Sequence, residues 1–338
     1  MTTEITPEFI QGLPKAELHL HIEGTLEPEL KLELAKRNKV DIGQSTIEEV
    51  RQAYQYDDLA SFLAVYYPAM QVLQQEQDFY DLAFSYLRRA AENNVRHVEI
   101  FFDPQAHTSR DISFETVISG LHRAIVDARA LNVDAELIMC FLRDFSKESA
   151  RKTLLEAMPY KDWIIGVGLD SDEHNNPPLK FARQYEDAAA AGMHLTAHCD
   201  IDQKDSIDHI RQALEIMGVE RIDHGTNIVE DPDLVDFVVN HQVGLTSCPL
   251  SNSFVRPQMK GEEILQLLSK GAKICINSDD PAYFGGYIND NYYALADQFN
   301  LTQQQVIQLA RNSFEASWIS DEKKALYLAE IDEYVAKH

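Results

Sequence analysis

The chain has 338 residues, of which 45% are hydrophobic, and its formal net charge is −25. This composition can supply a large core. The negative charge argues against nucleic acid or an anionic membrane as a partner, because both would be repelled. The sequence shows no apolar run of membrane-spanning length and no secretory signal. Its four scattered cysteines are typical of reduced, buried thiols. We therefore expect a cytoplasmic protein.

Two histidines stand at strand spacing in the run 16–22. His19 and His21 alternate there with Leu18 and Leu20, and alternate residues of a strand project from the same face. Both imidazoles therefore point into one space, which suits a metal ion better than a packed core. Two histidines packed on a sheet surface are the alternative for this run alone.

The next part of the chain has a helical pattern. Thr25 is placed to cap a helix starting near Leu26, with Pro28 in its first turn. The pattern stays helical from about 45 to 94, and it includes an aromatic stripe with Phe62 and Tyr66. Packing between helices is the first interpretation of this stripe.

Short apolar runs rich in β-forming residues then alternate with segments of helix length. With the first run there are eight: 16–22, 95–102, 135–141, 164–169, 194–198, 221–224, 243–248 and 273–277. Regular alternation of strand and helix predicts parallel βαβ units, and eight such units close a barrel. The sequence therefore predicts an α/β fold. It is a single-domain (β/α)8 TIM barrel over 1–338, with additional helices after strand 1 and at the C-terminus.

Polar residues recur where these runs end. His198 ends the fifth run, His224 ends the sixth, and Asp279 and Asp280 follow the eighth. Reactive groups of such barrels come from the C-terminal ends of the strands, so we expect these side chains to meet the histidines of the first run. A satisfied core histidine, or an aspartate that caps the following helix, is the alternative for each residue alone.

Three imidazoles and one carboxylate form a ligand set that zinc accepts, with a position left for water. Zinc lowers the pKa of that water, so that hydroxide exists at neutral pH. Asp279 is placed to bind metal and to accept the proton of the water, and His224 can orient or deprotonate the nucleophile. Glu17 precedes the apolar run, and we expect a structural role for it.

These motifs resemble those of the adenosine and adenine deaminases of the amidohydrolase superfamily. The matching stretches occur in the family's order and span nearly the whole chain: Leu18-His19-Leu20-His21 with Glu23-Gly24, then His198, Asp223-His224-Gly225, Cys248-Pro249-Leu250-Ser251-Asn252 and Ser278-Asp279-Asp280-Pro281. The resemblance implies a zinc-dependent barrel enzyme, a hydrolase of C–N bonds that replaces the 6-amino group of a purine with oxygen.

The resemblance also implies roles for individual residues. The ligands of one zinc ion per chain would be His19, His21, His198 and Asp279. His224 would assist the hydroxide. Asp280 would hydrogen-bond the purine ring at N7.

Glu23 points to one branch of the family. Members that act on adenosine usually carry Asp there, which holds the ribose. Glu at this position resembles the branch that acts on free adenine bases, as do the stretches Phe101-Phe102-Asp103-Pro104-Gln105, Gly168-Leu169-Asp170-Ser171 and Pro281-Ala282-Tyr283-Phe284-Gly285-Gly286. The implied partner is a small purine base, with Glu23 among the residues that bind it.

One position departs from the family pattern. The family carries His-Ala-Gly-Glu on strand five, where the Glu protonates the purine ring, but Ile201 stands in its place here. Asp200, which keeps strand parity with His198, is our first candidate for the missing acid, and Asp202 is the second. A buried carboxyl with a raised pKa can serve as an acid.

A changed acid beside the reacting amine suggests a changed leaving group. We therefore expect N6-substituted, cytokinin-like adenines as the leading substrates, with hypoxanthine and an alkylamine as products. Adenine or adenosine is the alternative substrate. For a bulky amine, the stripe at Phe62, Tyr66 and Tyr67 would cover the N6 tail.

Three other classes of protein share part of this pattern. The first is a barrel hydrolase with two metal ions, which often carries a carboxylated lysine at the end of strand four. This chain has Leu169-Asp170 there and no lysine, which favours a single metal ion. A purine-binding protein that lost its catalytic acid is the second. The zinc deaminases with a P-C-x-x-C signature are excluded, because the chain has no such motif.

Overall fold

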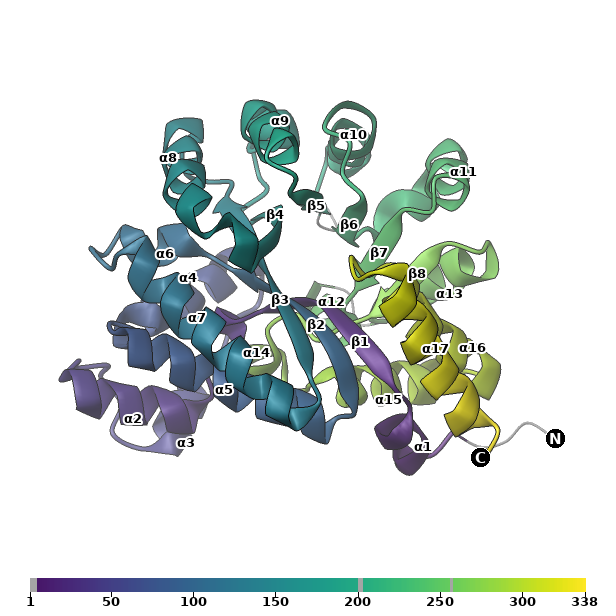
Figure 1. Ribbon diagram of the computed structural model, residues 1–338, viewed down its shortest axis with the longest axis horizontal. Coiled ribbons are helices and arrows are strands. Elements are labelled where there is room, and N and C mark those ends of the chain that lie inside the picture. The colour runs from purple at the N-terminus through teal and green to yellow at the C-terminus, as the bar shows by residue number, and fades with distance from the viewer. Residues whose placement is uncertain (1–4, 200–202, 256–257) are drawn as a thin grey trace.

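Eight parallel strands form a barrel surrounded by helices (Figure 1) in the computed structural model, which describes residues 5–199, 203–255 and 258–338. The strands follow one another in chain order: β1 (Lys15–His21), β2 (Val95–Phe102), β3 (Asp134–Leu142), β4 (Ile164–Asp170), β5 (His194–Cys199), β6 (Arg221–His224), β7 (Gly244–Ser247) and β8 (Lys273–Ile276). Each strand end lies within one residue of its predicted position. The predicted α/β barrel is therefore confirmed.

The barrel closes between β1 and the segment that follows β8. Leu20 and Asp279 form an isolated parallel bridge. In it, the His21 amide donates to the Asp279 carbonyl (3.0 Å), and the Asp279 amide donates to the His19 carbonyl (3.1 Å). The backbone bonds that complete the barrel thus also fix the spacing of His19, His21 and Asp279.

Helices connect the strands and cover the outside of the barrel (Figure 1). In chain order they are α1 (Pro7–Gly12), α2 (Pro28–Asn38), α3 (Ile47–Ala53), α4 (Leu59–Ala69), α5 (Glu76–Glu92), α6 (Pro104–Thr108), α7 (Phe114–Ala128), α8 (Lys147–Ala157), α9 (Ala182–Ala190), α10 (Ser206–Arg211), α11 (Pro232–Asn240), α12 (Pro249–Val255), α13 (Gly261–Ser269), α14 (Pro281–Phe284), α15 (Ile288–Phe299), α16 (Gln303–Glu315) and α17 (Asp321–Val335). The additional helices are where the sequence predicts them, between β1 and β2 and after β8. Within the described ranges, no helix has both the length and the apolar character that a membrane crossing requires.

The predicted start of the first long helix is wrong. α2 begins at Pro28, and Thr25 does not cap it. The Thr25 hydroxyl instead donates to the Ile22 carbonyl (2.7 Å) within a 3-10 turn, η1 (Glu23–Thr25). The local hydrogen bond therefore prevails over helix capping, and a tight turn directly follows β1.

The backbone of this turn packs closely against the segment that follows β8. A Cβ atom on Gly24 would lie 2.0 Å from Oδ1 of Asp280 and 2.6 Å from its Cα. Only glycine lets the backbone pass this closely. The Gly24 contact therefore holds Glu23 near Asp280 at the same end of the barrel.

The apolar core lies between the barrel and its helices. Leu18 and Leu20 of β1 are fully buried there, on the opposite face from the two histidines. Cys199 of β5 also lies in this core. All four cysteines are buried.

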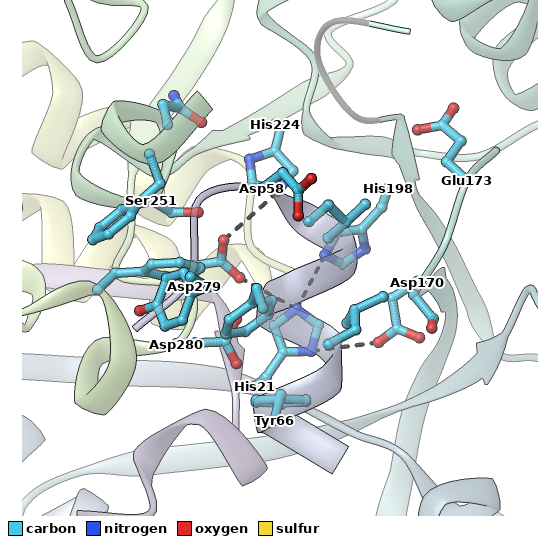
Figure 2. Close-up of a pocket in the computed structure, with 18 of the residues that line it drawn as sticks. His21, Asp58, Tyr66, Asp170, Glu173, His198, His224, Ser251, Asp279 and Asp280 are labelled. Carbon is cyan, nitrogen blue, oxygen red and sulfur yellow. Dashed lines mark hydrogen bonds and ion pairs between the residues drawn. The ribbon is translucent and has the colours of Figure 1, made fainter. Parts of the chain in front are cut away.

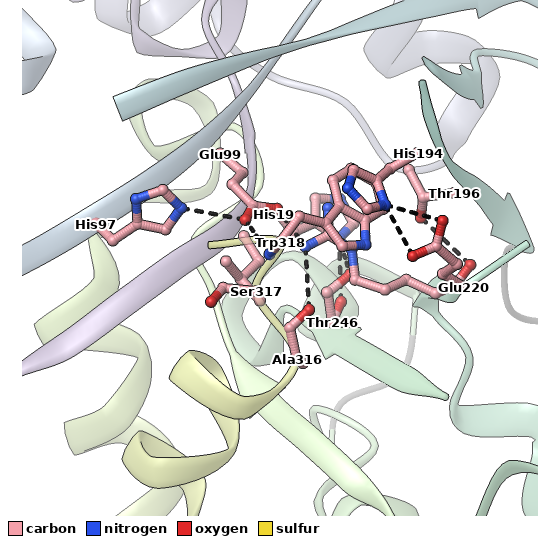
Figure 3. Close-up of polar contacts among 12 residues, drawn as sticks. His19, His97, Glu99, His194, Thr196, Glu220, Thr246, Ala316, Ser317 and Trp318 are labelled. Atoms are coloured by element: carbon pink, nitrogen blue, oxygen red, sulfur yellow. Dashed lines mark hydrogen bonds and ion pairs between the residues drawn. The ribbon is translucent and has the colours of Figure 1, made fainter. Parts of the chain in front are cut away.

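Polar contacts join β2 and β6 to the segment that follows α16 (Figure 3). Glu99 of β2 pairs with Arg221 of β6 and accepts a hydrogen bond from the Trp318 amide (2.6 Å). The Arg221 guanidinium stacks on the Trp318 indole, 3.5 Å from its centroid, and His97 Nε2 lies 3.1 Å from Glu99 Oε1. Because these charges are paired, they have a structural role at the base of the barrel.

Candidate active site

Four side chains meet at the C-terminal end of the barrel. His19 and His21 come from β1, His198 comes from β5, and Asp279 follows β8. Their possible ligand atoms all lie within 4.8 Å of one another, and all four residues are buried. The structure therefore brings together the four ligands that the sequence predicts.

The distances within this cluster fit a metal ion. Nε2 of His198 lies 3.0 Å from Nε2 of His19 and 3.1 Å from Nε2 of His21. Oδ1 of Asp279 lies 3.3 Å and 3.4 Å from the Nε2 atoms of His19 and His21. Ligand atoms about 2.0–2.1 Å from a tetrahedral zinc lie about 3.4 Å apart. Both the chemistry and the spacing of this donor set suit such an ion.

The hydrogen bond that Nδ1 of His19 makes fixes which of its two ring nitrogens carries the proton. Nδ1 of His19 lies 3.0 Å from the Thr246 carbonyl oxygen. A carbonyl only accepts, so Nδ1 carries the proton and Nε2 keeps its lone pair. Lone pairs that converge at 3.0 Å repel one another unless a cation or a proton lies between them. His19 is therefore held in the form that binds metal.

An aspartate carboxylate lies near the Nδ1 atom of each of the other two histidines. Nδ1 of His21 lies 3.4 Å from Oδ2 of Asp170, and Nδ1 of His198 lies 3.5 Å from Oδ2 of Asp223. Asp223 is itself held by the Thr246 hydroxyl, which donates to its Oδ1 (2.9 Å). Such outer partners orient metal-binding histidines. The sequence motifs include both aspartates, but sequence reasoning assigned neither of them a role beside a histidine ligand.

His224 lies beside Asp279 (Figure 2), and its ring centroid is 4.7 Å from that of His19. Its Nε2 lies 3.7 Å from Oδ2 of Asp279. Burial and the neighbouring His19 lower the pKa of His224 to about 4. Near neutral pH, His224 is therefore an uncharged imidazole that can accept a proton.

The two aspartates after β8 have opposite electrostatic environments. Burial disfavours the charge of Asp279, but the surrounding histidines, His19 first, outweigh burial and hold the pKa of this carboxyl well below its usual range. Burial and the negative charge of Asp279 raise the pKa of Asp280 well above its usual range. A neutral Asp280 can donate a hydrogen bond, which an ionised carboxylate cannot.

A cavity of about 340 Å³ opens onto this cluster, and His21, His198, His224, Asp279 and Asp280 all line it. Figure 2 shows these side chains converging from different strands.

The predicted aromatic stripe lines the same cavity. Phe62, Tyr66 and Tyr67 contribute to its wall from α4. Phe62 and Tyr66 also pack against Tyr283, with ring centroids 5.7 Å and 5.3 Å apart. The predicted packing is therefore confirmed for Phe62 and Tyr66, and the same side chains also border the cavity.

The candidate proton donors lie outside the described residues. Asp200, Ile201 and Asp202 fall in a gap of the description, so the structure places neither Asp200 nor Asp202. Two residues near this segment, Glu173 after β4 and Gln203, do line the cavity.

A (β/α)8 barrel that gathers three histidines and one aspartate at its strand ends is the architecture of metal-dependent amidohydrolases. The adenosine deaminase family profile matches residues 14–334. The chain therefore belongs to the adenosine deaminase family of the amidohydrolase superfamily. It is accordingly an enzyme, a hydrolase that acts on C–N bonds, and deaminases of this type depend on a metal.

Individual relatives match nearly the whole chain. An uncharacterized deaminase of Schizosaccharomyces pombe is 52% identical, with 98% of both chains covered. An adenine deaminase of Hahella chejuensis is 49% identical over 98% of this chain and 99% of that protein. The crystal structure of an adenine deaminase from Arthrobacter aurescens has a TM-score of 0.92 at 46% identity, covering 96% of this chain and 99% of that one. A zinc-bound amidohydrolase from Burkholderia ambifaria has a TM-score of 0.88 at 26% identity, covering 99% and 95%.

Proposed function

We propose that the protein is a zinc-dependent adenine deaminase, which hydrolyses the C6–N bond of adenine to give hypoxanthine and ammonia. The observation that carries this proposal is the cluster of His19, His21, His198 and Asp279, of which the last three line a cavity of about 340 Å³. Relatives about half identical to this chain over nearly its whole length are named adenine deaminases. One zinc ion per chain is proposed, because these residues form one complete ligand set.

Zinc, when bound, lowers the pKa of its water to about 7, which makes a hydroxide nucleophile available. The residues around it then handle protons and position the base. Asp279 presents Oδ1 toward the histidine ligands and Oδ2 toward His224, so it stands where the proton of the water is removed. The uncharged His224 accepts a hydrogen bond from the nucleophile and orients it. We propose that Asp280 donates to N7 of the purine.

Protonation of the ring and of the leaving amine needs an acid as well. Ile201 cannot donate a proton, so we propose Asp200, and after it Asp202, for this role. Both flank the position that holds the family's glutamate, directly beyond His198.

A second candidate substrate class is the N6-substituted adenines, which would release an alkylamine. The observation that favours it is the apolar part of the cavity wall, which is formed by Leu59, Phe62 and Leu63 of α4 together with Phe254 and Phe284. The cavity of about 340 Å³ is more than twice the size of an engineered cavity of about 150 Å³ that holds benzene. It therefore has room for a purine with a small apolar group on N6.

Metal removal and replacement test the proposal. The purified protein would be stripped with a chelator and titrated with Zn²⁺, while the ultraviolet change from adenine to hypoxanthine is followed. We expect chelation to abolish turnover and one equivalent of Zn²⁺ to restore it. Turnover that survives chelation, or that requires two equivalents, would contradict a single zinc site.

A further inference from the structure

A second group of metal-binding side chains lies directly beside the proposed zinc ligands. It consists of His224, Cys248 and Asp279, and one ligand atom from each lies within 4.8 Å of the other two. All three residues are buried. Asp279 belongs to both groups, because its Oδ1 lies 3.3 Å from Nε2 of His19 and its Oδ2 lies 3.7 Å from Nε2 of His224. The Asp279 carboxylate therefore lies between two places where an ion can bind.

Three neighbouring strands supply this second group. His224 is the last residue of β6, Cys248 directly follows β7, and Asp279 follows β8. β7 pairs in parallel with both β6 and β8, so the C-terminal ends of the three strands lie side by side. The backbone of the barrel therefore brings an imidazole, a thiol and a carboxylate together.

The donor set determines which ions this group can hold. Imidazole nitrogen, thiolate sulfur and carboxylate oxygen are the three kinds of ligand that Zn²⁺ uses in proteins. A thiolate favours Zn²⁺ and softer ions such as Cd²⁺, whereas Mg²⁺ and Ca²⁺ prefer oxygen ligands. Binding releases the proton of the Cys248 thiol to solvent, because only the thiolate is a ligand. The group therefore suits a sulfur-preferring divalent ion.

The cavity gives an ion access to this group. His224 and Asp279 line the cavity, and Cys248 is fully buried. An ion that enters through the cavity meets the imidazole and the carboxylate, and water in the cavity can complete a tetrahedral set. The second group has three protein ligands instead of four, and it shares one of them. We therefore expect weaker binding here than at the proposed zinc ligands.

We propose that His224, Cys248 and Asp279 form a second, inhibitory site for a sulfur-preferring divalent ion. Asp279 bridges this ion and the proposed zinc through its two oxygens, and ions about 3.5–4 Å apart are usual in two-metal sites. The inhibition rests on the proposed function, in which His224 orients the nucleophile and Asp279 stands where its proton is removed. A second ion takes the lone pairs that both steps need. Excess Zn²⁺ therefore stops turnover.

The activity test raises Zn²⁺ beyond the first equivalent. Enzyme loaded with one Zn²⁺ per chain is assayed on adenine with increasing Zn²⁺ or, for comparison, Mg²⁺. We expect inhibition by Zn²⁺ alone. In Cys248→Ala, the Zn²⁺ concentration that halves activity should rise at least about tenfold, because even the loss of an outer partner of a metal ligand typically costs 10–100-fold. Activity at one equivalent should stay near that of the wild type, because Cys248 is not one of the four proposed zinc ligands.

Binding is measured separately with Cd²⁺, whose bond to a thiolate gives an ultraviolet absorption band. The zinc-loaded enzyme is titrated with Cd²⁺, and bound Zn²⁺ is measured in the same samples. The four proposed zinc ligands include no thiolate, so exchange of Cd²⁺ for that zinc gives no band. We expect a band from one thiolate per chain in the wild type, and none in Cys248→Ala or in Cys248→Ser, which keeps the size of the side chain.

Cys275→Ala is the matched control for both measurements. Cys275 is buried as fully as Cys248, but its Sγ lies 3.6 Å from the Leu245 carbonyl oxygen, and it belongs to neither group of ligands. We expect this variant to keep the Cd²⁺ band and the inhibition by Zn²⁺.

Three results would overturn the inference: equal inhibition of the wild type and Cys248→Ala, no band in a wild type with zinc-dependent turnover, and activity that rises with the second equivalent of Zn²⁺. A wild type that shows the band, loses it in C248S and yet converts no adenine would refute the proposed function and leave the second metal site standing. The two failures are therefore distinguishable.

Discussion

Oδ2 of Asp279 lies 3.7 Å from Nε2 of His224, and both residues have a left-handed backbone, with φ of 64° and 65°. Such angles are strained for residues with a side chain, and they persist where the surrounding structure imposes them. His224 ends β6, and Asp279 is fixed by the bonds that close the barrel against β1. The strained backbone at both positions brings a carboxylate and an imidazole together beside the metal cluster.

Replacing His224 should separate proton handling from metal binding. His224→Ala removes the imidazole beside Asp279 but none of the four proposed ligands. We expect zinc content to stay near that of the wild type, while kcat falls by about 10²-fold or more, as for loss of a general acid–base group. Steady-state kinetics and metal analysis on the same sample check this. A change in KM alone would show that the role assigned to His224 is wrong.

Replacing a proposed ligand should have a different result. His19→Ala or Asp279→Ala leaves an incomplete donor set, so we expect the loss of both bound zinc and activity. His241→Ala, at an exposed histidine far along the sequence from the cluster, is the matched control and should retain both. Full activity in either ligand variant would refute the site.

Replacing Asp170 tests whether the carboxylates beside the histidine ligands support zinc binding. Its Oδ2 lies 3.4 Å from Nδ1 of His21, and loss of such a partner typically costs 10–100-fold in metal affinity or activity. We expect Asp170→Asn to weaken zinc binding by about that factor in a competition titration with a chelator. Asp172→Asn, two residues farther along the chain and with a side chain that is 44% exposed, should leave the affinity unchanged. Equal affinities in the two variants would remove Asp170 from this role.

The acid that replaces the usual glutamate can be found by comparing Asp200→Asn with Asp202→Asn. We expect the larger loss of kcat, about 10²-fold, in Asp200→Asn, because Asp200 keeps strand parity with His198. The pH profile of kcat should lose its limb on the alkaline side in the same variant, since the acid must be protonated to act. Small, equal effects in both variants would show that neither residue donates the proton.

Much of the site could be predicted because strand parity is a local property. Alternation places His19 and His21 on one face of β1, and the end of an apolar run marks His198 as lying at the catalytic end of β5. Glu17 was expected to be structural, and its carboxylate indeed accepts hydrogen bonds from the Ser278 amide (3.0 Å) and the Tyr86 hydroxyl (2.5 Å).

What could not be predicted depends on contacts between distant segments. Nε2 of His107 on α6 lies 2.9 Å from Oε1 of Glu23 in the turn after β1, and no periodicity in the sequence marks this contact. Thr25 was predicted as a helix cap because its side chain suits that role, but a nearer acceptor, the Ile22 carbonyl, takes its hydroxyl. The aromatic stripe on α4 has the same pattern whether it packs or borders a cavity, so only the folded structure shows that it does both.

The most direct test of the central claim is the kcat/KM of the zinc-loaded enzyme for adenine, adenosine, N6-methyladenine and isopentenyladenine, measured side by side. We predict that adenine exceeds each of the others by more than about tenfold, a ratio of the size that a single hydrogen bond or methylene group produces. A higher value for the N6-substituted bases would show that the departure at Ile201 marks a changed leaving group. A higher value for adenosine, or no turnover of adenine, would contradict the proposed function.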